Sequence, residues 1–368
     1  MVLCTDEIEA LLLLRWCHFI PVRDFRAVFS KTTLQTLQAF GCITVNEKYN
    51  AYILTNRGDR FLSHNFDHIP PSTRRTYRES NVVHRIDSSR LALCAYRAGL
   101  SVFTTKQSEI EAEATFYLAA LSRTAKNNPW GSSRVIALVH LGDMICGVYP
   151  VRSKNAGISM NDELTALNNN TAHFRCKKRG IIFTGKSYEA IHSALRVTAD
   201  TPEKAKYISY GDFYARTSLP TFMVPWNDSG AMQLHMMLHP DFRVRMTMAA
   251  LGSHWIAPPK EHSEWDAIYE DMPQILAADM NLKRIDAAIL SAQACGRAPV
   301  CLSALSGQAD FLRKQYKPDG LVKKVVTFSS GKDVVREELT LHTPSDRLFV
   351  TKKGAVVHAP PIKNAGKA

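Results

Sequence analysis

Residues 30–62, SKTTLQTLQAFGCITVNEKYNAYILTNRGDRFL, predict a short helix, a two-stranded ribbon and the start of a second helix. Ser30 can cap the first helix, because its hydroxyl can accept a backbone N–H of the first turn. Leu34, Leu37 and Phe40 recur at intervals of three residues and give this helix one apolar face. Gly41 is expected to end the helix, since glycine tolerates the left-handed backbone that often follows a helix C-terminus.

The other face of the expected helix is polar, and its side chains can exchange hydrogen bonds with base edges and phosphates. These residues are Lys31, Thr32, Thr33, Gln35, Thr36 and Gln38. Residues 42–45 and 52–55 are β-prone runs on either side of a polar segment, which predicts a hairpin with a mobile tip. We therefore expect a DNA-binding surface that also includes Lys48 and Tyr49 at the hairpin tip and Arg57 after the hairpin.

Two further helices are predicted before this stretch. Residues 6–18 have acidic residues in the first turn and a leucine-rich apolar face. Pro21 is expected to begin a helix over residues 22–29 that meets the next helix without a linker, as a helix-turn-helix requires. Residues 1–65 therefore resemble a winged-helix domain, and LTNRG at residues 54–58 resembles the passage from the wing into the closing helix. The resemblance implies DNA binding, with protein docking or dimerisation as the alternative.

Length and composition set the broad class. The chain has 368 residues, of which 45% are hydrophobic, and this predicts a globular protein of two or three domains. The N-terminus lacks a signal-peptide pattern, no apolar run reaches membrane-spanning length, and the 8 cysteines follow no disulfide or zinc spacing. We therefore expect a cytoplasmic protein with reduced thiols and no membrane association.

The basic residues are unevenly distributed along the chain. The formal net charge of +12 favours a polyanionic partner. Residues 1–66 hold seven Lys or Arg against six Asp or Glu, whereas residues 313–368 hold twelve against five. We therefore expect contacts with backbone phosphates from the C-terminal stretch, in particular from Lys323, Lys324, Lys352 and Lys353. A solvated surface and a disordered tail are the alternative interpretation.

The order of elements predicts an α+β or α/β protein, in which the winged helix-turn-helix precedes a larger mixed α/β domain. The expected divisions are a DNA-binding domain at residues 1–65, a linker at 66–84, a scaffold at 85–300, a basic extension at 301–358 and a disordered tail at 359–368. Within the scaffold we expect a hairpin at residues 134–151, a buried strand at 181–184, and helices at 109–126 and 260–278.

This order of parts is similar to that of the replication-relaxation family. The likeness lies in the winged helix, an Arg-rich helical bridge, the hairpin near residues 135–149 and a basic segment leading into the strand RGIIF at residues 179–183. Members of this family are accessory proteins of plasmids and integrative conjugative elements, associated with relaxase function or replication control. The resemblance covers about residues 1–240 and implies a role in replication, conjugation or transcription regulation.

The sequence offers little support for the common catalytic motifs. It has no dinucleotide-binding fingerprint and no nucleophile elbow. GIIFTGKS at residues 180–187 fits the phosphate-loop spelling, but residues 181–184 within it are expected to form a buried strand rather than a loop. The family resemblance invites comparison with a restriction-endonuclease-like core, in which an Asp and an acid-x-Lys triplet hold Mg²⁺. Asp143 lies at the expected hairpin tip, but the next strand ends in VRSK at residues 151–154, without an acid two residues before the Lys. We therefore expect any such core to be degenerate and inactive.

One metal-like spacing is present. His235 and His239 lie four residues apart on an expected helix, and His254 or His262 could supply a third ligand. The Glu that would act as base in a zinc-protease helix is missing. Packed or surface histidines are the preferred interpretation, and neither a metal nor a cofactor is expected.

The preferred interpretation is a sequence-specific, non-catalytic DNA-binding accessory protein of a mobile genetic element. Its expected partners are double-stranded DNA, replication or transfer proteins, and a second copy of the chain in a homodimer. A metal-dependent nuclease or nicking enzyme is one alternative. A protein-binding inhibitor that uses the winged helix as a docking surface is the other.

Overall fold

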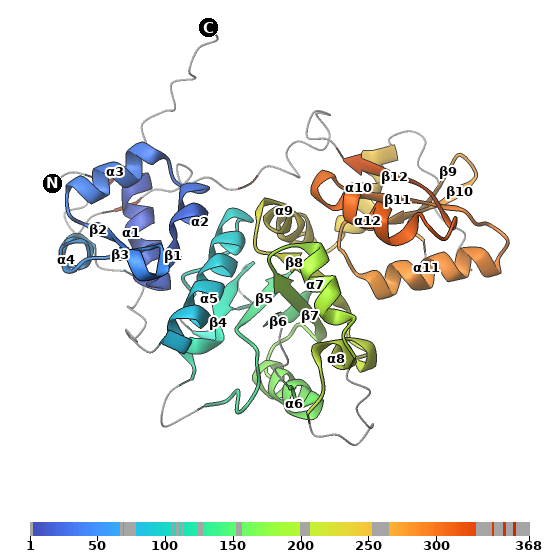
Figure 1. Cartoon of the computed structure of the whole chain (residues 1–368), viewed down its shortest axis with the longest axis horizontal. Coiled ribbons are helices and arrows are strands. Elements are labelled where there is room, and N and C mark those ends of the chain that lie inside the picture. Colours follow the sequence, from blue (N-terminus) through green and yellow to red (C-terminus); the bar gives the residue numbers. More distant parts are fainter. Residues whose placement is uncertain are drawn as a thin grey trace, which may run out of the picture. The chain divides into compact units, whose positions relative to one another are not determined.

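The computed structural model describes residues 3–66, 69, 79–104, 106–107, 110–111, 114–123, 128–151, 157–198, 207–251, 265–328, 341, 349–350 and 356–357. The chain forms two compact units, Met1–Arg97 with His342–Ala368, and Ala98–Leu341. Both combine helices with strands, so the protein belongs to the α+β class (Figure 1). Among the described residues, no helix combines the length and apolar character needed to cross a membrane.

The first unit packs helices around a small antiparallel sheet. Strands β1 (Ile20–Pro21), β2 (Ile43–Asn46) and β3 (Ala51–Leu54) lie in the order β1-β3-β2, and the 3-10 helix η1 (Glu47–Tyr49) joins β2 to β3. The α-helices of this unit are α1 (Thr5–Cys17), α2 (Val22–Arg26), α3 (Lys31–Ala39), α4 (Asn56–Asn65) and α5 (Glu79–Arg97). Two short strands, β13 (Phe349–Val350) and β14 (Val356–Val357), also pair antiparallel in this unit.

The predicted helices and ribbon of residues 6–62 are present, and β1 is an element that the sequence patterns missed. Helix α1 is buried on every side rather than along one face, because α3, α4, α5 and β3 all contact it. Its leucines at positions 11, 13 and 14 and Trp16 are all fully buried. This helix therefore forms the centre of the first core, and α5 begins at Glu79, inside the segment expected as a linker.

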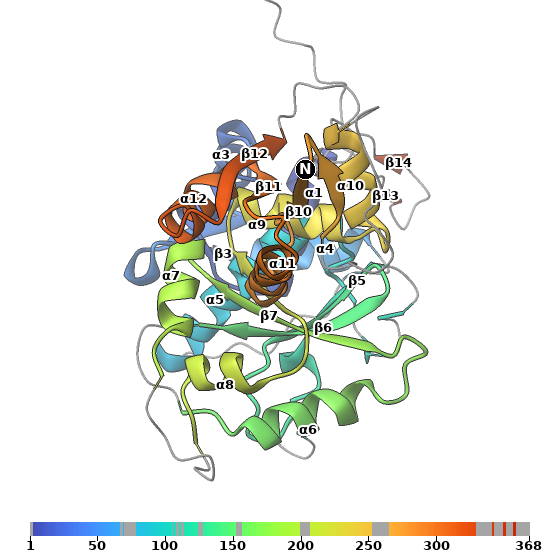
Figure 2. The ribbon, with the colours of Figure 1, turned by 90° about the vertical axis from the view of Figure 1, so that its right-hand side faces the viewer.

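The second unit begins with a mixed sheet. Strands β4 (Phe116–Leu118), β5 (Ala137–Leu141) and β6 (Met144–Pro150) are antiparallel, and β7 (Lys178–Gly185) and β8 (Thr221–Pro225) continue the sheet parallel to β6. The direction changes at β6 because a tight turn joins it to β5, whereas helix α6 (Met160–Thr171) joins it to β7. Helices α6 and α8 (Tyr210–Arg216) cover one face of this sheet, and α9 (Asp228–Met237) covers the other (Figure 2).

A second sheet follows α10 (Phe242–Leu251). Strand β9 (Ala267–Tyr269) is antiparallel to β10 (Met272–Leu276), and β11 (Val300–Leu305) and β12 (Val322–Phe328) run parallel to β10. Helix α11 (Leu282–Ala294) links β10 to β11, and η5 (Ser306–Gln308) with α12 (Ala309–Tyr316) links β11 to β12. One hydrophobic cluster includes residues of both sheets, such as Phe183 and Leu302, so the two sheets share a core.

Two predicted helices of the scaffold are wrong. Within residues 109–126 the chain forms strand β4, whose residues are all buried along β5. Within residues 260–278 it forms β9 and β10, separated by a turn in which Glu270 and Asp271 have positive φ. Strand β4 is buried along its whole length and so lacks the apolar–polar alternation that marks a strand in sequence. The turn between β9 and β10 is formed by Glu270 and Asp271 instead of glycine or asparagine, so the usual hairpin signal is missing there. The boundary expected at residue 300 falls at the start of β11, within the shared core.

Candidate nucleic-acid interface

Helix α3 presents a polar face to solvent. The Ser30 hydroxyl accepts the backbone N–H of Thr33 at 3.1 Å, as the sequence predicted for the helix cap. Leu34 and Leu37 are buried, which fixes the rotation of the helix about its axis. As a result, Lys31, Thr32, Gln35 and Gln38 are exposed, and Thr36 is half-buried.

Thr33 does not belong to this face. Its side chain is buried, and its hydroxyl lies 2.8 Å from the hydroxyl of Ser30. The prediction that Thr33 contacts DNA is therefore corrected: it completes the cap at the start of α3.

The hairpin tip is held in place by local contacts. The Asn46 side chain accepts the backbone N–H of Tyr49 at 3.3 Å, and the Asn50 carbonyl accepts the N–H of Val22 at 3.0 Å. The Tyr49 ring packs edge-on against Phe19, with 5.8 Å between ring centroids, and Lys48 Nζ lies 5.4 Å from the Tyr49 centroid. A structured tip thus replaces the mobile one that the polar sequence predicted, and Tyr49 is half-buried while Lys48 is exposed.

The start of α4 is fixed against the end of α3. The Thr55 hydroxyl lies 2.7 Å from the Gly41 carbonyl oxygen and 3.0 Å from that of Cys42, and it also accepts the backbone N–H of Gly58 at 3.2 Å. Arg57 is exposed beside Gly41, since a Cβ added to Gly41 would lie 3.8 Å from Arg57 Cδ. Arg57 therefore lies next to the C-terminal end of α3.

Two acidic residues of the first unit form ion pairs with arginines of α1 and α5. Asp24 accepts Arg90 Nε of α5 at 2.8 Å, and Asp59 pairs with Arg15 of α1. Exposed basic residues that form no ion pair with any described residue remain on α2, α3 and α4. They are Arg23, Arg26, Lys31, Arg57 and Arg60. The sequence patterns did not single out Arg23, Arg26 and Arg60, because the net charge of that region is close to zero.

The C-terminal lysines of the prediction lie elsewhere or are not described. Lys323 and Lys324 belong to β12 of the second unit, where Lys324 Nζ lies 3.3 Å from Glu270 Oε2 and 5.0 Å from the Tyr269 ring centroid. Lys352 and Lys353 fall outside the residues that the structure describes. Among the predicted residues that the structure describes, those of helix α3, the hairpin tip and Arg57 lie together in the first unit.

Asp143, the acid compared with a nuclease site, and three other acids near the first sheet of the second unit each have a local partner. Asp143 pairs with Lys178, and Asp212 caps α8 together with Ser209. Asp162 accepts the Ser132 hydroxyl at 2.9 Å. Glu163 is buried and accepts the backbone N–H of residue 134 at 2.7 Å, and burial raises the pKa of this carboxyl.

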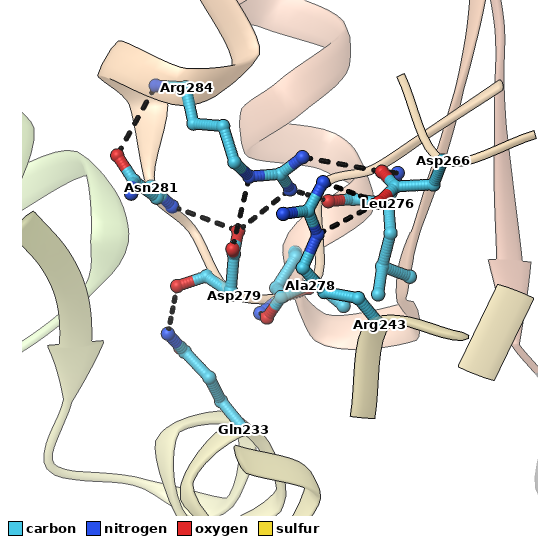
Figure 3. A network of polar contacts seen from close by, with 9 residues as sticks. Gln233, Arg243, Asp266, Leu276, Ala278, Asp279, Asn281 and Arg284 are labelled. Atoms are coloured by element: carbon cyan, nitrogen blue, oxygen red, sulfur yellow. Dashed lines mark hydrogen bonds and ion pairs between the residues drawn. The ribbon is translucent and has the colours of Figure 1, made fainter. Parts of the chain in front are cut away.

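A second group of acids lies between α10, β10 and α11 (Figure 3). Arg284 Nη1 lies 3.2 Å from Asp266 Oδ2, and Arg284 Nε lies 3.3 Å from Asp279 Oδ2. Arg243 Nη2 also reaches Asp266, at 2.6 Å. The guanidinium groups of Arg243 and Arg284 pair with both carboxylates, so removing one partner would leave a buried charge unpaired.

His235, one of the two histidines with metal-like spacing, contacts a backbone carbonyl. His235 Nδ1 lies 3.0 Å from the Ala98 carbonyl oxygen, which occupies one ring nitrogen. Within the part of the chain that the structure describes, no three His, Cys, Asp or Glu residues are grouped to hold a metal ion. His254 and His262 lie outside that part.

Comparison of the chain with protein-family models, curated proteins and solved structures found no match.

Proposed function

We propose that residues 1–66 form a winged helix-turn-helix that binds double-stranded DNA, with α3 as the reading helix. In this proposal α2 and α3 are the helix-turn-helix, β2 and β3 are the wing, and α4 is the closing helix. The chain then acts as a non-catalytic, sequence-specific accessory protein of a mobile genetic element. The second unit is the scaffold for dimerisation or for docking replication or transfer proteins.

The exposed face of α3 carries this proposal. Gln35 and Gln38 are three residues apart on that face, and glutamine amides can make paired hydrogen bonds with adenine in the major groove. The leucines behind them are fully buried or nearly so, which holds the glutamines in a fixed direction. A reading helix needs this combination of an exposed polar face and a rigid support.

Exposed basic residues without a described acidic partner are the second observation that supports DNA binding. Because Asp24 and Asp59 are held by Arg90 and Arg15, the exposed surfaces of α2, α3 and α4 carry basic residues without matching acids. Such residues suit backbone phosphates, which position a protein on DNA without reading its sequence. The first unit can thus bind a polyanion even though its sequence is nearly neutral.

The resemblance to the replication-relaxation family supports a role in a mobile genetic element. We also propose that the first sheet of the second unit is a degenerate restriction-endonuclease-like core. The acids nearest its strands are engaged in ion pairs, caps and buried hydrogen bonds. This arrangement favours a non-catalytic role over a nuclease, because metal-dependent cleavage needs carboxylates that converge on the ion.

The first experiment is recovery of bound fragments from the protein's own replicon, with purified full chain and with or without Mg²⁺. We expect enrichment of discrete fragments without cleavage. Cleavage in Mg²⁺ would favour the nuclease alternative. Failure to enrich any fragment would overturn the DNA-binding proposal and favour protein docking by the winged helix.

The reading role of α3 is tested by the double variant Gln35→Ala, Gln38→Ala. Since each good base contact contributes about 1–3 kcal/mol of discrimination, the preference for the enriched site over random duplex should fall by about tenfold or more. Fluorescence anisotropy with both duplexes measures this ratio. Gln293→Ala, an exposed glutamine of α11, is the matched control. Equal decreases in affinity for both duplexes would show that these glutamines do not read bases.

A further inference from the structure

A groove separates helices α7 (Tyr188–Leu195) and α12 in the second unit. Its volume is about 400 Å³, which lies within the range of small-molecule sites. One wall is formed by side chains on successive turns of α7, from Glu189 through His192 and Ser193 to Arg196 at its end. Phe311, Lys314 and Gln315 of α12 form the other wall.

Aromatic rings form the inner part of this groove. Phe311 is buried, and the His192 ring meets it edge-on with 5.3 Å between ring centroids. Tyr188 supports Phe311 from the protein side, at 6.1 Å between centroids. Burial, and then the charge of Arg196, lower the pKa of His192. The His192 ring is therefore mainly neutral at neutral pH and can pack against another flat ring.

Two cations line the outer part of the groove. Arg196 and Lys314 are exposed, and neither forms an ion pair with a described residue. In contrast, Arg313 on the same helix as Lys314 lies 3.0 Å from Asp310. Glu189 is the acid that lines the groove, so the positive charges exceed the negative charge there.

We propose that the groove between α7 and α12 binds a small ligand that joins a flat ring to a phosphate, such as a nucleoside monophosphate. The ring packs against Phe311 and His192, and the phosphate lies between Arg196 and Lys314. Phosphate suits this place because a guanidinium and an ammonium can together offset its two charges. This site lies in the second unit and is independent of the proposed DNA-reading helix.

The test is isothermal titration calorimetry of the full chain with AMP and UMP, compared with adenosine and inorganic phosphate. We expect both monophosphates to bind more tightly than either adenosine or phosphate alone. Arg196→Gln or Lys314→Gln should weaken AMP binding by about tenfold each, since each variant removes charge-assisted hydrogen bonds. Glu189→Gln should strengthen it by a few-fold, because a repelling charge is removed.

Lys317→Gln is the matched control, as Lys317 is an exposed cation that ends the same helix without lining the groove. It should leave AMP affinity unchanged. The proposal is overturned if AMP does not bind at millimolar concentration, or if Lys317→Gln weakens binding as much as Lys314→Gln. It is also overturned if Arg196→Gln lowers thermal stability without changing affinity, since Arg196 would then serve only the C-terminus of α7.

Discussion

The ion pairs of Asp24 and Asp59 affect how charge is distributed over the surface of the first unit. Each aspartate is held by an arginine of a helix far away in the sequence, since 66 positions separate Asp24 from Arg90 and 44 separate Asp59 from Arg15. These side chains are half-buried at the surface, where an ion pair typically contributes below about 1 kcal/mol to stability. Its importance here is electrostatic, because two acids that would repel DNA are neutralised by arginines outside α2, α3 and α4.

At the residue scale, the double variant Arg57→Gln, Arg60→Gln should weaken binding to cognate and random duplexes by the same factor. These arginines are exposed on α4 without a described acidic partner, and we expect them to bind phosphates. The salt dependence of binding should become shallower by about one unit of slope for each phosphate that the variant no longer neutralises. Titrations from low to moderate salt measure this slope.

Charge reversal at Lys323 and Lys324 is the companion measurement, because the sequence predicted phosphate contacts there. We expect a shallower slope again, and an unchanged slope would place β12 away from the DNA. If the slope also stays unchanged for the α4 variant, the proposed phosphate binding by Arg57 and Arg60 is wrong.

Helix α4 of the first unit approaches its neighbours closely at Gly58. A Cβ at this position would collide with the backbone carbonyl oxygen of Cys42 and lie 2.7 Å from Leu54 Cδ1. Together with the hydrogen bonds of Thr55, this close approach sets the distance between α4 and the end of α3. The glycine of the LTNRG sequence is therefore explained by packing, and Arg57 is positioned as a consequence.

At the element scale, Gly58→Ala should destabilise the first unit by about 1–3 kcal/mol, because a backbone carbonyl cannot move aside as a flexible side chain can. Urea unfolding followed by circular dichroism measures the change. Gly320→Ala would be a poor control because of its positive φ. Ala39→Gly, at the exposed end of α3, changes backbone entropy without a clash and should cost less. A Gly58→Ala variant as stable as the parent would refute the close packing of α4.

On the scale of the whole second unit, one buried chain of hydrogen bonds connects helices α7 and α9 with β11 and the loop after β10 of the second sheet. Gln308 Nε2 lies 3.1 Å from Tyr188 Oη and 2.9 Å from the Ala278 carbonyl oxygen, and its Oε1 accepts the N–H of Leu305 at 3.0 Å. Tyr188 in turn donates to Gln233, which donates to the Asp279 carbonyl oxygen at 2.7 Å. Figure 3 shows the last of these bonds beside the Arg284 ion pairs.

Gln308→Leu should therefore destabilise the second unit by about 2–4 kcal/mol. The variant removes, in one step, the hydrogen bonds that buried Gln308 makes with the Leu305 N–H, the Tyr188 hydroxyl and the Ala278 carbonyl. Chemical denaturation measures the change in the free energy of unfolding. Gln293→Leu, at an exposed position of α11, is the control and should have a small effect. DNA binding by the first unit should persist in Gln308→Leu under native conditions. An equal stability of the two variants would contradict the proposed contribution of these hydrogen bonds.

Sequence patterns predicted local elements well where a cap, a turn or a regular spacing of apolar residues marks them. Helix α3, the hairpin of β2 and β3, and the hairpin of β5 and β6 were all anticipated because caps, turns and periodicity are encoded within a few residues. The errors at β4, β9 and β10 arose where strands are buried on both faces or end at turns with unusual φ. At Thr33 the pattern identified a polar residue, but only the packed cap shows that it is buried.

The sequence by itself determined that α3 has an apolar and a polar face, where its cap lies, and that a ribbon follows it. The tertiary structure decided which cations of the first unit remain without a described acidic partner, why Gly58 stands at the start of α4, and that a groove lies between α7 and α12. The physical reason is how far apart along the chain the interacting residues lie. Caps and periodicity act over a single helical turn, whereas ion pairs, close backbone packing and cavities depend on residues that only the folded chain brings together.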